Sequence, residues 1–359
     1  MSATVLIVSA DSLLIDDLMR LATAADVESR LATDPTSARA AWREAALIVV
    51  GADLAGDLAR SSPERRPGVI LAAAEPDGDE VYRLAVETGA QQVIALPAGE
   101  TWLVEQMAAA AEPARRRAAV VAVLGGRGGA GASVLAAVLA GVAARHRLRT
   151  LLLDGDPLGG GIDLVLGAEG TPGARWSDYA DRQGRLSTAT LHDSLPARDG
   201  LAVLSWHRGA AEPVSPETMR SVLDAAVRGY DLVVADLPRQ LTDAGAEVLA
   251  AADSTLIVVP AEVRATVAAD RVADLVRNYS RDLRVVVRGP APGGLKPAVI
   301  AESLRLPLAG VVATDRRLAT AIERGHRPAR GGALDGFCRR FLTDLREVRP
   351  MSGEGGGRP

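Results

Sequence analysis

Residues 119–133, AVVAVLGGRGGAGAS, decide the fold that the sequence predicts for the larger part of this chain. The stretch opens with a continuous apolar run, as expected of a strand that is buried on both faces of a parallel sheet. A glycine-rich turn follows, and residues 133–146, SVLAAVLAGVAARH, then have the composition of a helix. A strand, a tight turn and a helix in this order predict an α/β unit.

The turn matches the phosphate-binding pattern G-x-x-x-x-G-K-[ST] at every fixed position except one. Gly126, Gly131 and Ser133 are in register, whereas Ala132 stands where the pattern has lysine. Backbone N–H groups in such a loop, with the positive end of the next helix behind them, favour phosphate oxygens. An ordinary glycine turn is the alternative, and the loop by itself does not distinguish the two. The residues predicted to contact a nucleotide here are Gly126, Arg127, Gly128, Gly129, Gly131, Ala132 and Ser133.

Aspartates follow two further apolar runs, RTLLLDGDP at 149–157 and YDLVVADLP at 230–238. Because parallel strands end at one edge of their sheet, Asp154, Asp156 and Asp236 are expected beside the glycine turn. We predict that Ser133, Asp156 and Asp236 hold Mg²⁺ and that Asp154 contacts the cofactor. Asp156 is the predicted catalytic residue, orienting the water that attacks the γ-phosphate. Helix N-capping is the alternative role for each carboxylate.

Apolar strands alternate with helix-length segments twice along the chain, the pattern of parallel sheets flanked by helices. The first set comprises TVLIV, ALIVV, GVILAA and QQVIAL and ends near residue 98, with a helix expected at 100–112. The second set also contains GLAVLSW, STLIVVPAE, LRVVVRG and LPLAGVVA. We therefore predict an α/β protein with two doubly wound, mainly parallel-sheet domains. The expected boundaries are 1–112 for the first domain, 113–118 for a linker, 119–349 for the second domain and 350–359 for a disordered tail.

Residues 118–346 resemble the MinD/ParA/CpaE family of deviant Walker A ATPases. The resemblance implies a P-loop fold, ATP or ADP with Mg²⁺ as cofactors, a homodimer, and a role in positioning division or pilus and secretion machinery. It rests on segments whose order and spacing agree with the family pattern, namely RGGAGAS, DGDPLGGG, ADLP, AADSTLIVVPAEVRATVAADRV and LPLAGVVATDRRLATAIERG.

Three departures from the family pattern concern the nucleotide. Arg127 replaces the signature lysine, which in the family reaches the phosphates of the partner subunit, and Ala132 removes the lysine that bridges the β- and γ-phosphates in cis. Arg288 stands near the place of an asparagine that the family uses beside adenine. These departures imply a regulatory protein with weak or absent ATP hydrolysis. Two alternatives stay open: an active ATPase in which Arg127 acts in trans, and a ParA-like DNA-partitioning protein.

Residues 1–112 resemble a response-regulator receiver domain in size and strand rhythm. A receiver needs an acidic pocket and an aspartate nucleophile, and Asp11 lies where the pocket acids begin. The phosphoacceptor position holds Gly51, and the expected hydroxyl and lysine positions hold Ala73 and Leu96. We predict a pseudo-receiver used for docking or dimerisation, with Asp53 as a displaced phosphoacceptor the alternative. A receiver-like domain ahead of the ATPase-like domain points to the CpaE-like branch, whose actinobacterial members are described as septum site-determining or secretion-neighbourhood proteins.

Composition restricts the partners and the compartment. The net charge of −4 gives no overall attraction to nucleic acid, and the basic run at 115–117 is expected to be a solvated linker, so DNA is a disfavoured partner. The single cysteine excludes a disulfide framework and fits a reducing compartment. The N-terminal stretch MSATVLIVSADS lacks the pattern of a signal peptide, so we expect a cytoplasmic protein.

The stretch LDGFCRRFLTDLREV at 334–348 predicts an amphipathic helix that contains both phenylalanines of the chain. Its apolar face either packs on the domain or lies against the inner face of the cell membrane, and amphipathicity alone does not separate these alternatives.

Overall fold

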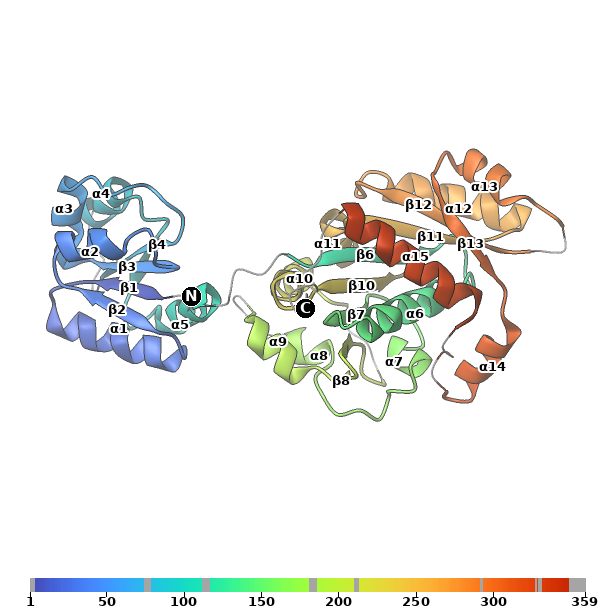
Figure 1. Ribbon diagram of the computed structural model, residues 1–359, viewed down its shortest axis with the longest axis horizontal. Coiled ribbons are helices and arrows are strands. Elements are labelled where there is room, and N and C mark those ends of the chain that lie inside the picture. Colours follow the sequence, from blue (N-terminus) through green and yellow to red (C-terminus); the bar gives the residue numbers. More distant parts are fainter. Residues whose placement is uncertain are drawn as a thin grey trace, which may run out of the picture. The chain divides into compact units, whose positions relative to one another are not determined.

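The computed structural model describes residues 4–73, 79–111, 117–180, 186–209, 213–290, 293–326, 328 and 331–348. The chain divides into two compact units, Met1–Arg115 and Arg116–Pro359, each with its own sheet (Figure 1). Both units are α/β, and each sheet is mainly parallel, which confirms the predicted fold class.

The first unit has a five-stranded parallel sheet with the order β2-β1-β3-β4-β5. Helices α1 and α5 pack on one face, and α2, α3 and α4 pack on the other. Strand β2 was not predicted because its sequence, SRLA, has no apolar run and lies at the sheet edge. The strands are β1 Val5–Val8, β2 Ser29–Ala32, β3 Leu47–Gly51, β4 Val69–Ala73 and β5 Gln92–Ala95, and the helices are α1 Ser12–Ala24, α2 Pro35–Ala41, α3 Ala52–Arg60, α4 Asp79–Thr88 and α5 Glu100–Ala111.

The second unit has an eight-stranded sheet with the order β13-β12-β11-β6-β10-β7-β9-β8. Only the two-residue strand β8 runs antiparallel to its neighbour. The central strands are rich in Val, Leu, Ile and Ala and are almost entirely buried, as the continuous apolar runs predicted. The strands are β6 Ala119–Gly125, β7 Thr150–Asp154, β8 Ala197–Arg198, β9 Leu201–Leu204, β10 Leu232–Leu237, β11 Ser254–Pro260, β12 Leu283–Gly289 and β13 Leu308–Ala313.

Helices cover both faces of this sheet. One face carries α6 Ala132–Arg145, α7 Ile162–Val165 and α15 Gly332–Val348. The other face carries α8 Ser177–Ala180, α9 Thr188–Ser194, α10 Pro216–Gly229, α11 Asp243–Ala251, α12 Val263–Val276 and α13 Pro297–Leu304. The remaining helix, α14 Arg316–Glu323, follows β13 at the carboxyl edge of the sheet, where the loops after β6, β7 and β10 also lie (Figure 1).

The amphipathic C-terminal helix forms as predicted, and its apolar face is packed inside the domain. Phe337, Cys338, Phe341, Leu342 and Leu345 of α15 are buried in the cluster that contains α6 and the sheet face. Of the two alternatives for this face, the structure therefore shows packing on the domain. No helix within the described residues is long and apolar enough to cross a membrane.

Candidate functional site

The glycine turn that joins β6 to α6 has a conformation that requires glycine at several positions. Gly129 and Gly131 have φ angles of 70° and 99°, in the left-handed region that side chains disfavour. A Cβ on Gly126 would lie 2.6 Å from Cβ of Ala269 in α12, so the loop passes close to that helix. Helix α6 begins at Ala132 with no side-chain cap. Its first N–H groups are therefore left for a ligand or solvent.

The sheet order brings the predicted carboxylates to this turn. Strand β10 lies between β6 and β7, and Asp236 is level with Val123 on one side and Asp154 on the other. The side chains of Asp154 and Asp236 are buried, with residue exposures of 2% and 5%. Asp156 is half-buried, and its carboxylate accepts a hydrogen bond from the Leu158 N–H. The structure thus places all three predicted carboxylates at one edge of the sheet.

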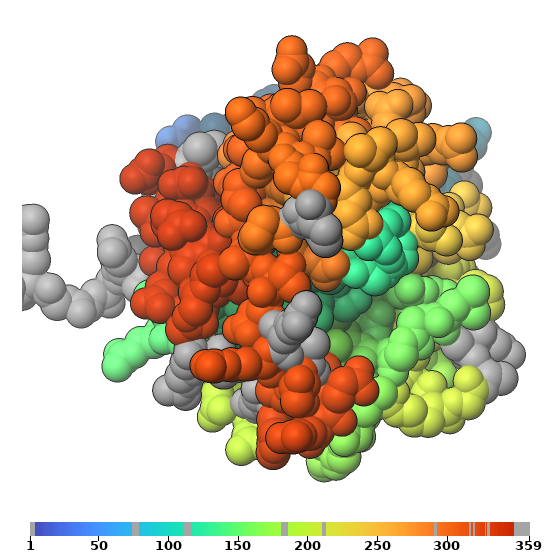
Figure 2. Space-filling view, turned by 90° about the vertical axis from the view of Figure 1, so that its right-hand side faces the viewer, coloured from blue at the N-terminus to red at the C-terminus, as the bar shows by residue number. Residues whose placement is uncertain are grey.

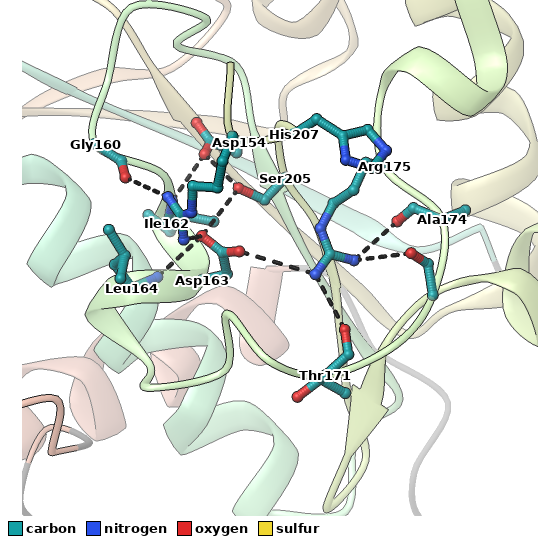
Figure 3. A network of polar contacts seen from close by, with 12 residues as sticks. Asp154, Gly160, Ile162, Asp163, Leu164, Thr171, Ala174, Arg175, Ser205 and His207 are labelled. Atoms are coloured by element: carbon teal, nitrogen blue, oxygen red, sulfur yellow. Dashed lines mark hydrogen bonds and ion pairs between the residues drawn. The ribbon is translucent and has the colours of Figure 1, made fainter.

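The Asp154 carboxylate is hydrogen-bonded to the loop that follows β7 and to Ser205 (Figure 3). Its carboxylate accepts hydrogen bonds from the Ile162 N–H at 2.8 Å, the Ser205 hydroxyl at 2.9 Å and the Asp156 N–H at 3.2 Å. Burial raises the pKa of this carboxyl to about 6. Because its oxygens already bind the loop that follows β7, Asp154 positions that loop and Asp156 with it.

A second buried carboxylate, Asp163, belongs to the same network and carries no sequence motif. Its partners are the guanidinium groups of Arg208 at 3.0 Å and Arg175 at 3.9 Å, and the Ser205 hydroxyl at 3.5 Å. Ser205 therefore connects Asp163 to Asp154 (Figure 3). No sequence motif marks these residues, because only the three-dimensional path of β9 brings Ser205 and Arg208 to the glycine-rich loop.

Asp236 is the most perturbed carboxyl at the site. Burial raises its pKa to about 7, the charges of Asp154 and Asp156 push in the same direction, and a hydrogen bond with Ser133 opposes them. A buried, mutually repelling set of carboxylates is stabilised by a proton or by a cation. Within the described ranges, no group of three or more His, Cys, Asp or Glu side chains is arranged to hold a metal by itself. Mg²⁺ here would take phosphate and water oxygens beside Ser133, Asp236 and Asp156.

Two cavities flank the turn. The first, of about 440 Å³, is lined by Ser133, the three carboxylates and the glycines at 159–161. The second, of about 190 Å³, is largely apolar and lies between α6 and the ends of β11, β12 and β13, with Gly131 and Arg288 at its wall. Ile322 of α14 lines both. Figure 2 shows this face of the molecule, with the start of α6 between α12 and the segment after β7 and with α14 beside them.

Arg127, at the signature position of the turn, is held within its own chain. Its Nη2 atom lies 3.0 and 3.1 Å from the two carboxylate oxygens of Glu262, the residue just before α12. Its Nε atom is buried and has no hydrogen-bond partner among the residues that the structure describes. A role for Arg127 in trans would require this guanidinium to leave Glu262.

In the first unit, Asp53 fills the place of a receiver's acidic pocket. Its carboxylate accepts hydrogen bonds from the Ala10 N–H at 2.7 Å, the Ser9 hydroxyl at 3.0 Å and the Asp11 N–H at 3.1 Å. A Cβ on Gly51 would collide with the Asp53 carboxylate and lie 2.9 Å from Cδ2 of Leu14. The turn after β1 is therefore stabilised by Asp53, and Gly51 leaves room for it.

We expect acetyl phosphate with Mg²⁺ to add no phosphoryl group to this unit, as measured by intact mass. We also expect Asp53→Ala to lower the free energy of unfolding by about 1 kcal/mol, because the donors on residues 9–11 lose their acceptor. Asp57→Ala, on the same helix but paired only with the exposed Arg60, is the control and should change stability less. Phosphorylation that disappears in the Asp53→Ala variant would contradict this interpretation.

The fold and the site define a two-unit protein with a receiver-like N-terminal unit and a MinD/ParA-like P-loop unit. A family described as Rv3660c-like, CheY-like N-terminal domain matches residues 8–118. The protein Rv3660c of Mycobacterium tuberculosis is 39% identical over 345 residues, covering 95% of this chain and 96% of its own length. The chain belongs to this Rv3660c-like family.

More distant similarities concern the P-loop unit. A septum site-determining protein MinD of Guillardia theta is 26% identical over 207 residues, which cover 56% of this chain and 77% of that protein. A ParA family ATPase from Chlorobium tepidum has a TM-score of 0.56 at 16% identity, covering 63% of this chain and 98% of that one. MinD in a MinC:MinD cell division complex of Aquifex aeolicus has a TM-score of 0.53 at 23% identity, covering 63% of this chain and 96% of that one.

MinD of Pyrococcus horikoshii, solved with Mg-ADP, has a TM-score of 0.52 at 16% identity, with 64% of this chain and 98% of that chain covered. These structures show that the second unit has the MinD/ParA fold.

Proposed function

We propose that this protein binds ATP or ADP with Mg²⁺ as a regulatory signal and hydrolyses ATP weakly or not at all. The observation that carries the proposal is a phosphate loop whose backbone geometry is intact while its lysine is absent. Gly129 and Gly131 keep the left-handed turn, and α6 begins uncapped behind it. Ala132 supplies no charge at the position where the pattern has lysine.

Binding and hydrolysis depend differently on the missing lysine. Backbone N–H groups and the helix N-terminus contact the phosphates of substrate and product alike. A lysine between the β- and γ-phosphates stabilises the charge that develops during transfer, which is the main catalytic contribution in this chemistry. Ser133, Asp236 and Asp156 would hold Mg²⁺, and Asp156, the most accessible of the three carboxylates, would orient water. The chain therefore keeps the groups for binding and lacks one that accelerates the reaction.

We infer further that the protein acts as a homodimer through the face around the turn. Leu158, Val263 and Val267 are 89%, 66% and 57% exposed, and they belong to the loop after β7 and the first turns of α12. Exposed apolar side chains on both sides of a ligand site favour contact with another protein surface. A second copy on this face would place Arg127 near the partner's nucleotide.

The cellular role that we propose is positioning of the division site or of a pilus or secretion apparatus, in the cytoplasm. Support comes from the septum site-determining MinD relative and from the MinC-bound MinD structure, which share this unit's fold. The receiver-like unit, proposed to span residues 1–112 and to place the protein in the CpaE-like branch, would serve docking. The apolar face of α15 is already packed, so contact with a membrane would have to use another surface. Net charge disfavours DNA.

The test is equilibrium binding of ATP and ADP to the purified full chain with and without Mg²⁺, together with phosphate release. We expect wild type to bind both nucleotides with little turnover. Asp156→Ala should weaken the Mg²⁺-dependent part of ATP binding about tenfold, the typical loss for one charged contact of 1–2 kcal/mol. Glu169→Ala serves as the control, since this exposed carboxylate lines the same cavity and is not among the proposed ligands of Mg²⁺. No ATP or ADP binding by wild type would refute the proposal.

An active ATPase with Arg127 in trans is the second candidate. The buried Nε of Arg127, which has no partner within the described residues, favours a further contact for this guanidinium. Turnover in wild type that is lost in both Arg127→Ala and Asp156→Ala would establish this candidate and exclude the regulatory one.

A further inference from the structure

The side chain of Arg288, at the end of β12, lies against the phosphate loop. A Cβ on Gly131 would be 3.2 Å from Nη1 and 3.9 Å from Cδ of Arg288. Its guanidinium therefore reaches the residue that immediately precedes Ala132, on the side of the turn opposite the carboxylates. Gly131 and Arg288 also share the wall of the apolar cavity of about 190 Å³.

This guanidinium is half-buried and has no close counterion. Within the described residues, the Arg288 side chain makes no hydrogen bond or ion pair. Burial lowers its pKa, the charge of Arg127 lowers it further, and the charge of Glu262 partly opposes them. Glu262 is engaged by Arg127, and Asp315, which lines the same cavity, caps α14 by accepting from the Arg317 N–H.

A half-buried guanidinium such as that of Arg288 usually has an anionic partner. A partly desolvated guanidinium without a partner is costly, and an anion between it and a set of free backbone N–H groups would satisfy both. The start of α6 supplies those N–H groups, since Gly131 provides no side-chain cap. A fixed, planar guanidinium can bind two oxygens of one phosphate group.

We propose that Arg288 binds the phosphates of the nucleotide in cis and supplies the positive charge that the loop lacks at Ala132. In this proposal the guanidinium contacts the phosphates that lie farther from Ser133 and Asp236, because Arg288 lines the apolar cavity whereas those two residues line the other one. The charge on this side holds the ligand without reaching the oxygens that gain charge during transfer. A charge in this place would support nucleotide binding without accelerating transfer, and this inference rests on the proposed function.

The test compares wild type, Arg288→Gln and Arg288→Lys, each as the full chain, by calorimetry with MgATP, inorganic triphosphate and adenosine. Arg284→Gln is the matched control, because Arg284 lies on the same face of β12 at its other end and pairs with Asp282. We expect Arg288→Gln to weaken ATP and triphosphate binding about 10- to 100-fold, the effect of one charge-assisted contact. The affinity of Arg288→Gln for adenosine should change less than about twofold. Arg288→Lys should recover part of the lost affinity for ATP and triphosphate. The Arg284→Gln control should bind all three ligands as wild type does.

The outcomes separate this inference from the proposed function. Unchanged ATP binding in Arg288→Gln would overturn the inference alone, as would equal losses for ATP and adenosine, which would indicate a role in shaping the cavity. If wild type binds neither ATP nor triphosphate, both proposals fail. Thermal midpoints of the variants show whether each is folded. If Arg288→Gln is not folded, the binding of Arg288→Lys is compared with that of wild type instead.

Discussion

Asp236→Asn is expected to stabilise the protein without Mg²⁺ and at the same time to remove Mg²⁺-dependent nucleotide binding. Burial raises the pKa of Asp236 from an ordinary value of 3.8 to about 7. Between these values the folded protein holds a proton that the unfolded chain has lost, so stability decreases as the pH rises through this range. Above about pH 7 the folded carboxylate is charged and buried among other carboxylates, and asparagine removes that cost.

The expected gain at about pH 8 is on the order of 4 kcal/mol, at about 1.36 kcal/mol for each unit of pKa difference. For a unit of this size that corresponds to a thermal midpoint about 8–16 °C higher. Below about pH 3 the gain should largely vanish, because the carboxyl is then mostly protonated in both states. Thermal unfolding with a chelator at a series of pH values measures this, and calorimetry with MgATP measures the loss of binding.

Asp231→Asn is the matched control for this experiment. Asp231 immediately precedes the same strand and is also buried, but its carboxylate accepts the Arg149 N–H at 2.8 Å and pairs with the Arg149 guanidinium. Removing a paired charge leaves the arginine without its partner, so this variant should be destabilised. If both variants shift stability in the same direction, Asp236 does not carry the cost that its burial implies.

Such opposite effects on stability and binding distinguish a site selected for a ligand from one selected for packing. The protein places ionisable groups in a buried position where the folded chain alone gains nothing from them. Asp154 differs, since its oxygens are hydrogen-bonded within the domain. The same residue type at neighbouring strand ends thus serves a structural role at Asp154 and, in our proposal, a ligand-binding role at Asp236.

Much of the fold was predictable, because long runs of Val, Leu and Ile identify strands buried on both faces. The strands that escaped prediction, β2 and β8, lie at sheet edges, where pairing rather than composition defines them. The cluster of Ser133, Asp154, Asp156 and Asp236 followed from motifs and the rule that parallel strands end at one edge. Glu262 and Arg288 could not be placed, since their contacts with the turn depend on the pairing of β11 with β6 and of β12 with β11.

Arg288 shows this limit most clearly. The sequence presents it only as a departure from the family's asparagine, because a strand residue more than 150 positions after the turn has no local link to it. Residue type and spacing show that the loop has no lysine at Ala132. They do not show that the side chain of Arg288, which is distant in sequence, contacts the loop.

Ala132→Lys is expected to give the protein ATP hydrolysis at least about 100-fold faster than wild type, in the range attributed to one group that stabilises developing charge. The loop that must present this lysine is already formed, since Gly129 and Gly131 hold the left-handed turn and α6 starts at residue 132. Ser133 and Asp236 lie beside it, and Asp156 remains available to orient water. Phosphate release at saturating MgATP measures the gain, which should disappear when Asp156→Ala is added.

Ala132→Gln separates the charge of the new side chain from its length. Glutamine extends from the same half-buried position at the start of α6 and can donate hydrogen bonds, but it does not neutralise phosphate oxygens. We expect it to leave turnover at the wild-type level. If lysine and glutamine raise turnover equally, charge is not what the loop lacks. If lysine raises ATP affinity without any turnover, Asp156 and its surroundings are not arranged for hydrolysis. The absence of a lysine at Ala132 would then not be the sole reason that the protein binds ATP without hydrolysing it.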